Sequence, residues 1–276
     1  MAHHHHHHMS SAGRLQGKVA LVTGAGCIGP GWGNGRAIAV RFAEEGAHVI
    51  AVDRDLASMD ATLELVRAAG GSVTPCLCDV TDSASVERLV ADSVARCGRV
   101  DILVNNVGAP SPGGPVALDE AQWAMQLELN LTTAFLMCKY VLPVMEQQGG
   151  GAIVNIASTS GIRWTGAAQV GYAAAKAGMI QMGRVVAVEY AAKNVRVNSV
   201  VPGLLHTPMV DTKIAHNQAG GDVELLLRKR QARIPMPFMG DGRDTANAAL
   251  FLASDEARFV TGTEIVVDGG MSARCD

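Results

Sequence analysis

The chain has 276 residues, of which 48% are hydrophobic and 18% are charged, and its formal net charge at pH 7 is −3. This composition provides the apolar material for a folded core and excludes a chain that is disordered throughout. Lysine and arginine are scattered rather than clustered, and the apolar runs are much shorter than the roughly 18 residues of a membrane span, so neither nucleic acid nor a membrane is expected as a partner.

A run of histidines occupies positions 3–8, which is typical of an expression tag. We assign residues 1–9 to that tag and expect a single domain from residue 10 to residue 276. The six cysteines show no metal-binding spacing. They indicate reduced thiols, and therefore a cytoplasmic protein.

Short apolar runs alternate with longer segments of helical periodicity along the rest of the chain. Strands are predicted at 19–22, 48–52, 72–78, 102–104, 152–156, 195–200 and 264–267, and helices at 35–45, 56–69, 83–97, 119–146, 170–193 and 244–254. Strands that are almost wholly apolar and separated by helices are typical of a parallel sheet covered on both faces. The pattern predicts a single-domain, Rossmann-like, doubly wound α/β fold of about seven strands.

The stretch 204–242 breaks this alternation, because it holds three prolines, a pair of glycines and a charged helical run. A long insertion at the carboxyl end of a central strand is where a substrate lid would lie. A surface loop explains the same pattern equally well.

A glycine-rich segment, residues 23–35, follows the first predicted strand. Bare backbone at such a turn lets a pyrophosphate approach the amides of a helix N-terminus. A Gly-x-Gly-x-x-Gly match begins at Gly24, but a Pro-Gly pair comes directly after it and resists a helix. We therefore expect the helix to begin near Asn34, with Gly33 and Gly35 beside it.

The second predicted strand leads to Asp53, close to the ~20-residue offset at which a carboxylate meets the adenosine ribose. An acid there would bond the ribose 2′-hydroxyl and repel a 2′-phosphate, which favours NAD over NADP. Arg54 next to it could instead accept a phosphate. Asp53 could also simply cap the following helix, a role that is equally open to Asp55.

Tyr172 and Lys176 are four residues apart in a predicted Ala-rich helix, so they share one helix face. A phenol with its usual pKa near 10 is a poor base at neutral pH, but an ammonium beside it favours the phenolate. The pair could therefore exchange protons at physiological pH. The same spacing is also common in surface pairs.

Several further motifs occur in an order that is typical of one family. They are Thr23-Gly24, Cys78-Asp79-Val80, Asn105-Asn106-Val107-Gly108, Asn130, Ile156-Ala157-Ser158, Tyr172-x-x-x-Lys176, Val201-Pro202-Gly203, Thr207-Pro208 and Val266-Val267-Asp268-Gly269-Gly270. On these residues the chain resembles the short-chain dehydrogenases/reductases from about residue 15 to residue 273. It departs from them in a glycine-rich cofactor loop that is longer than the family's, within 27–32. We expect 33–35 to keep the pyrophosphate contacts and Trp32 to pack on the loop or near the adenosine.

The resemblance implies a nicotinamide-dependent oxidoreductase that transfers hydride between its cofactor and a secondary alcohol or ketone carbon. Tyr172 would pass the proton, and Lys176 would lower the tyrosine pKa and hold the nicotinamide ribose. Ser158 would bond the substrate oxygen, and Asn130 would support a water that leads to solvent. This chemistry needs an acid/base on oxygen and no metal. An isolated Asn such as Asn130 could also bond only its own helix backbone.

The predicted cofactor-binding residues are Gly24, Gly33, Asn34, Gly35, Asp53, Asp79, Val80, Asn106, Tyr172, Lys176, Pro202 and Thr207. By resemblance, Asp79 and Val80 would contact the adenine, and Asn106 the adenosine side. Pro202 and Thr207 would meet the nicotinamide end. Asn106 could instead only shape a turn after the fourth strand.

Two other functions remain open for the sequence. An NADPH-dependent carbonyl or 3-oxoacyl reductase is disfavoured by Asp53, and a cofactor-binding regulator without turnover is disfavoured by the presence of both Tyr172 and Lys176. The expected partner is a small-molecule alcohol or ketone. The Ala-rich helices at 119–145 and 171–192 carry more small apolar surface than one sheet face requires, so we also expect a homodimer or homotetramer.

Overall fold

The structure is a computed structural model that describes residues 13–211 and 218–276, so the tag assigned to 1–9 lies outside the described residues. Seven parallel strands form one sheet in the order β3-β2-β1-β4-β5-β6-β7. They are β1 (Val19–Thr23), β2 (His48–Asp53), β3 (Ser72–Leu77), β4 (Ile102–Asn105), β5 (Gly151–Ile156), β6 (Val195–Pro202) and β7 (Glu264–Val267). The predicted α/β fold with about seven parallel strands is confirmed.

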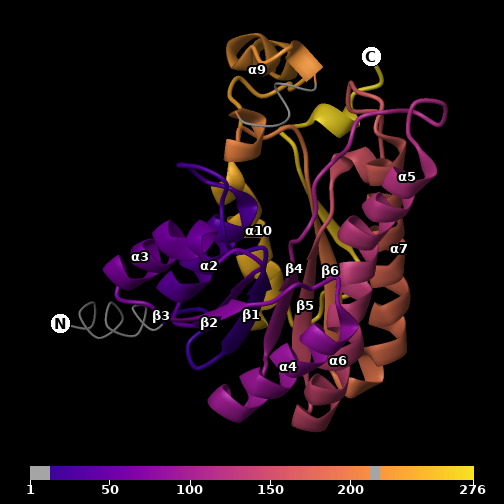
Figure 1. The fold of residues 1–276 in the computed structure, drawn as a ribbon. Coiled ribbons are helices and arrows are strands. Elements are labelled where there is room, and N and C mark those ends of the chain that lie inside the picture. Colours follow the sequence, from indigo (N-terminus) through magenta and orange to yellow (C-terminus); the bar gives the residue numbers. More distant parts are fainter. Residues whose placement is uncertain (1–12, 212–217) are drawn as a thin grey trace.

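Helices cover both faces of this sheet (Figure 1). One face carries α2 (Asn34–Glu44), α3 (Asp60–Ala68) and α10 (Gly242–Ala253), and the other carries α4 (Ser83–Cys97), α6 (Thr133–Gln148) and α7 (Val170–Tyr190). Neighbouring strand residues point to opposite faces, so Leu21 and Val22 belong to two different core clusters. Both clusters need apolar side chains, which is why the strands lack polar alternation.

Local signals set the ends of several helices. The Asp82 carboxylate accepts a hydrogen bond from the Ser85 amide at 3.0 Å and caps the start of α4, and Gly98, with a φ of 79°, caps its end. At the start of α10 the side chains of Asp241 and Asp244 form a reciprocal capping box.

The long helix predicted at 119–146 is interrupted. It consists of α5 (Glu120–Leu127), a π-helical turn (Glu128–Thr132) and α6. Asn130 lies in the π-helical turn and is 0% exposed. A single π-helical turn inside an α-helix often marks a functional position.

The strand order reverses between β1 and β4, and in open α/β sheets the ligand crevice lies outside the carboxyl ends at such a point. Helix α9 (Val223–Gln231) lies beyond this end of the sheet (Figure 1). It belongs to the 204–242 segment, of which residues 212–217 lie outside the described part. Within residues 13–211 and 218–276, no helix combines the length and apolar character needed to cross a membrane.

Candidate active site

A cavity of about 460 Å³ lies at the carboxyl ends of the strands. The predicted site residues that line it are Gly24, Gly33, Asn34, Gly35, Asp53, Asp79, Val80, Asn106, Ser158, Tyr172, Pro202 and Thr207. Two predicted residues, Asn130 and Lys176, are buried next to the lining rather than part of it. One cavity therefore brings together positions that are far apart in the sequence.

The glycine-rich turn forms a close backbone contact beside this cavity. Helix α2 begins at Asn34 with Gly33 as its N-cap, as predicted. A Cβ on Gly35 would collide with the Gly24 carbonyl oxygen and would lie 2.7 Å from Asn106 Nδ2. Only a residue without a side chain fits there, so the turn leaves bare backbone and helix N–H groups facing a prospective anion.

The extra loop residues are held in place by Arg36. Its Nη1 donates to the carbonyl oxygens of Gly29 at 3.1 Å and Gly31 at 2.9 Å, while its Nε donates to Thr62 Oγ1 at 3.2 Å. The side chain is buried, with 5% of the residue exposed. Sequence reasoning missed this role; the signal was an arginine in the first turn of a helix, directly before the apolar run Ala37–Val40.

Trp32 lies against α10 rather than in the cavity. Its carbonyl oxygen accepts the Gly242 N–H at 3.1 Å, and the Arg243 guanidinium stands 5.6 Å from its ring centre. The residue packs on the core cluster that includes α2 and α10. Cys27 and Ile28 line the cavity and Trp32 does not, so the packing of Trp32 gives no support to the expectation that it lies near the adenosine.

The carboxylate of Asp53 is anchored by backbone amides. Its Oδ2 accepts the Gly26 N–H at 3.0 Å, and its Oδ1 accepts the Asp55 N–H at 3.1 Å. Arg54 and Ser58 line the same end of the cavity. A carboxylate fixed in this way can accept a hydrogen bond from a hydroxyl group of a bound molecule.

Two neighbouring loops complete this end. The Asp79 carboxylate accepts hydrogen bonds from the amide and hydroxyl of Thr81, at 3.0 and 2.7 Å. The Asn106 side chain donates to the Gly24 carbonyl at 3.1 Å, and its backbone N–H donates to Thr23 Oγ1 at 3.0 Å. Asn106 thus ties the loop after β4 to the glycine turn.

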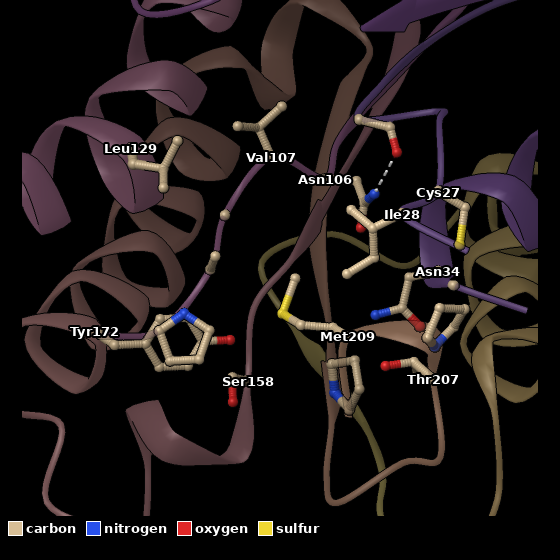
Figure 2. A pocket seen from close by; sticks show the side chains of 18 of the residues that line it. Cys27, Ile28, Asn34, Asn106, Val107, Leu129, Ser158, Tyr172, Thr207 and Met209 are labelled. Atoms are coloured by element: carbon tan, nitrogen blue, oxygen red, sulfur yellow. Dashed lines mark hydrogen bonds between the residues drawn. The ribbon is translucent and has the colours of Figure 1, made fainter. Parts of the chain in front are cut away.

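Tyr172 and Ser158 lie at another side of the cavity, away from Cys27 and Asn34, with Met209 between the two groups in the view of Figure 2. Burial raises the pKa of Tyr172, and the nearby Ser158 hydroxyl and the positive charge of Arg230 oppose that rise. Hydroxyls of this kind, placed together at a cavity wall, can bond one oxygen of a bound molecule.

Lys176 lies one helical turn beyond the tyrosine, with its Nζ 5.7 Å from the centre of the Tyr172 ring. The ammonium donates to the Ile156 carbonyl at 2.9 Å and is 3% exposed. Burial lowers the pKa of Lys176 to about 8. The prediction that Lys176 lowers the pKa of Tyr172 stays a prediction.

Asn130 is held by the loop that follows β4. Its Oδ1 accepts the Ala109 N–H at 2.9 Å, and its Nδ2 donates to the Ala109 and Gln126 carbonyls, each at 3.0 Å. A Cβ on Gly108 would clash with Asn130 Oδ1 and lie 3.1 Å from Lys176 Nζ. The amide and the ammonium therefore lie close to the same glycine.

Arg230 is a second residue that sequence reasoning missed. It comes from α9, lines the cavity and is 9% exposed. A usable signal was its spacing, since it follows Leu226 by four residues and shares its buried helix face.

Comparison with known proteins agrees with this geometry. The family model described as enoyl-(acyl carrier protein) reductase matches residues 30–272. The 3-oxoacyl-(acyl-carrier-protein) reductase of Thermotoga maritima is 38% identical over 258 residues, which cover 94% of this chain and 99% of that protein. The 2,5-dichloro-2,5-cyclohexadiene-1,4-diol dehydrogenase of Sphingobium indicum is 39% identical over 261 residues, with 95% and 98% covered.

A solved chain from Burkholderia xenovorans, described as a short-chain dehydrogenase/reductase, is 99% identical and superposes with a TM-score of 0.93 over 96% of this chain and 100% of that one. Fold, cavity and relatives together define an oxidoreductase that uses a nicotinamide cofactor. The chain belongs to the short-chain dehydrogenase/reductase family, as its sequence motifs predicted.

A nicotinamide dinucleotide fits the residues present. The close contact of Gly35 with Gly24 leaves bare backbone for a pyrophosphate, and the N-terminus of α2 adjoins that backbone. Asp53 and Tyr172 line one continuous cavity, so a molecule with an adenosine end and a reactive end can occupy both.

Proposed function

We propose that this enzyme interconverts a secondary alcohol and a ketone with NAD, and that Tyr172 exchanges the proton of the substrate oxygen. The observation that carries the proposal is the placement of the Tyr172 and Ser158 hydroxyls on one cavity wall, with the buried ammonium of Lys176 beside the tyrosine ring. The nicotinamide ring, when bound, supplies the acceptor or donor of hydride.

In the direction of oxidation, the substrate hydroxyl gives its proton to Tyr172 as its carbon loses hydride, so a carbonyl forms. Ser158 bonds the same oxygen and fixes it in place. Lys176 holds positive charge near the phenolate and binds the nicotinamide ribose. Asn130 keeps the loop around Gly108 in place and supports a water through which the proton reaches solvent.

Substitution of Tyr172 by Phe tests this assignment. The phenol oxygen is lost and the ring is kept, so we expect kcat to fall by about 1,000-fold. The affinity for NADH, measured by fluorescence titration, should remain. Tyr190→Phe, in the last turn of the same helix, is the matched control and should keep full activity. Full activity of the Tyr172 variant would refute the proposed mechanism.

We propose NAD rather than NADP because the Asp53 carboxylate is fixed at the adenosine end by two backbone amides. A 2′-phosphate there would meet a like charge, so kcat/KM should favour NAD by about 100-fold. Asp53→Asn keeps an oxygen that accepts hydrogen bonds and removes the charge. Its NAD preference should drop to about tenfold or less, and an unchanged preference would contradict this reasoning.

Arg54 supports a second candidate, an NADPH-dependent reductase of carbonyl or 3-oxoacyl compounds, since it lines the cavity beside Asp53. The relative from Thermotoga maritima is a 3-oxoacyl reductase by name. A higher kcat/KM with NADPH than with NADH, lost in Arg54→Ala, would establish this alternative over the first.

We also propose that the enzyme is a homodimer or homotetramer. Helices α6 and α7 expose large apolar side chains, among them Phe135 at 51% and Val188 at 80%. A monomer in analytical ultracentrifugation at micromolar concentration would contradict this proposal. A cytoplasmic location is supported by six free cysteines. Cell fractionation tests it.

The segment 204–242 is proposed as the substrate lid. Its described residues Leu205, Met209 and Arg230 line the cavity. Slower proteolytic cleavage within this segment in the presence of NADH and substrate would support closure, and equal rates would argue against it.

A further inference from the structure

Arg230 is a buried cation that the proton chemistry described above does not use. It is 9% exposed, and burial lowers its pKa to about 10. Its Nη1 donates to the Leu205 carbonyl at 3.2 Å, whereas its Nε is buried without a hydrogen-bond partner. A buried guanidinium in this state is costly unless something else pairs with it.

The chain itself provides no carboxylate for this cation. Among residues 13–211 and 218–276, no acidic side chain lies within ion-pair distance of Arg230, although its neighbour Arg228 pairs with Glu224 at 3.2 Å. The remaining residues, 1–12 and 212–217, contain no Asp or Glu at all. The partner of Arg230 therefore has to come from outside the chain.

The position of Arg230 limits what that partner is. It lines the same cavity as Tyr172, and the two groups are close enough for their charges to interact. The Leu205 carbonyl accepts from Nη1, so the edge of the guanidinium formed by Nε and Nη2 remains for a ligand. Such an edge can pair with both oxygens of a carboxylate. One guanidinium matches the single charge of a carboxylate.

We infer that the substrate is a hydroxy acid or keto acid whose carboxylate binds Arg230 while its hydroxyl or carbonyl oxygen meets Tyr172. The inference rests on the proposed function, because it takes Tyr172 as the group at the reacting oxygen. Arg230 sets specificity, because it holds the far end of the substrate and does not itself carry the transferred proton.

The test compares acids with neutral partners of the same shape. Secondary 2-, 3- and 4-hydroxycarboxylates are each assayed against their primary amides with NAD and the full chain. Wild type should prefer at least one acid by about 100-fold in kcat/KM, as expected for a charge-assisted hydrogen bond. Arg230→Met should lose this preference, even though the loss of a positive charge near Tyr172 lowers activity on acids and amides alike, and Arg230→Lys should keep part of the preference because the charge remains.

Equal activity on acids and amides in wild type, or an acid preference that survives in Arg230→Met, would overturn the inference. A preference for the phosphate ester of a diol over every acid would overturn the choice of carboxylate. A purely structural role would instead lower activity on acids and amides by the same factor, so the preference would survive in Arg230→Met. The kcat/KM ratio therefore separates the two roles even where a variant is less stable.

A binding experiment separates this inference from the proposed function. Succinate should raise the melting temperature of wild type in the presence of NADH, and succinamide should not. No shift with succinate contradicts the inference even if neutral alcohols turn over. A shift with succinate, together with no turnover of any alcohol, supports the carboxylate site and refutes the proposed function.

Discussion

Replacing Lys176 by Met removes a buried charge, and its effect on stability should depend on pH in a defined direction. Burial lowers the pKa of Lys176 from its usual 10.5 to about 8. Between these two values the unfolded chain binds the proton and the folded chain does not, so the folding stability of the wild type rises with pH. The destabilising effect of burying the lysine is full below about pH 8 and decreases up to about pH 10.5, where the unfolded chain also loses the proton.

The size of this effect follows from the two pKa values. Between about pH 7 and about pH 9.5, Lys176 should add about 2 kcal/mol to the free energy of unfolding. In the Met variant this increment is absent. A comparison of the two proteins at a single pH would not isolate this increment. The variant also leaves the Ile156 carbonyl without its donor, which lowers the free energy of unfolding by about 1–3 kcal/mol at every pH.

Urea unfolding of both proteins without cofactor, at one protein concentration, measures the difference at each pH. Other groups oppose the trend, since burial raises the pKa of Cys78 to about 11 and that of Cys138 to about 12, which lowers stability as pH rises. They are present in both proteins and cancel in the difference. Parallel stability curves for wild type and variant would refute the assignment of a neutralised buried lysine.

Three further substitutions test the glycine-rich loop. Gly35→Ala should raise the Kd for NADH at least about tenfold, because its Cβ meets the Gly24 carbonyl. The control Gly114→Ala, where no atom lies within 4 Å, should bind NADH normally, and equal Kd values for the two variants would be inconsistent with the close contact. Arg36→Met leaves two loop carbonyls without their donor, so it should lower stability by about 2 kcal/mol and weaken NADH binding, and unchanged calorimetry would count against the clamp. Trp32→Ala should lower the melting temperature but leave the Kd for NADH unchanged, since the indole packs on α10 outside the cavity; a weakened Kd would revive the adenosine contact.

The fold could be predicted because its strongest determinant, the alternation of short apolar runs with helical segments, is a local property of the sequence. Runs such as Val19–Thr23 bury every residue, as a short strand covered on both faces requires. The start of α2 at Asn34 was predictable for a similar local reason. The Pro-Gly pair resists a helix, so the helix can begin only after it.

The features that were missed depend on which side chains the folded chain buries and on the contacts that they make there. Arg36 and Arg230 are arginines that the fold buries, whereas arginine in a sequence is normally assigned to the surface. Two of the three partners of Arg36 are carbonyl oxygens, which every residue type carries, so no sequence pattern marks those two. The orientation of Trp32 likewise depends on α10, more than 200 residues further along the chain.

The π-helical turn could not be predicted from the sequence either, because its residues continue a helical pattern. A regular α-helix through 120–148 would need one residue fewer in this turn. Deleting one would restore a regular helix between α5 and α6 and would remove the turn that directs the side chain at position 130 toward Ala109. A change of length within this turn therefore moves Asn130, and homologous helices should be aligned on the turn rather than on their ends.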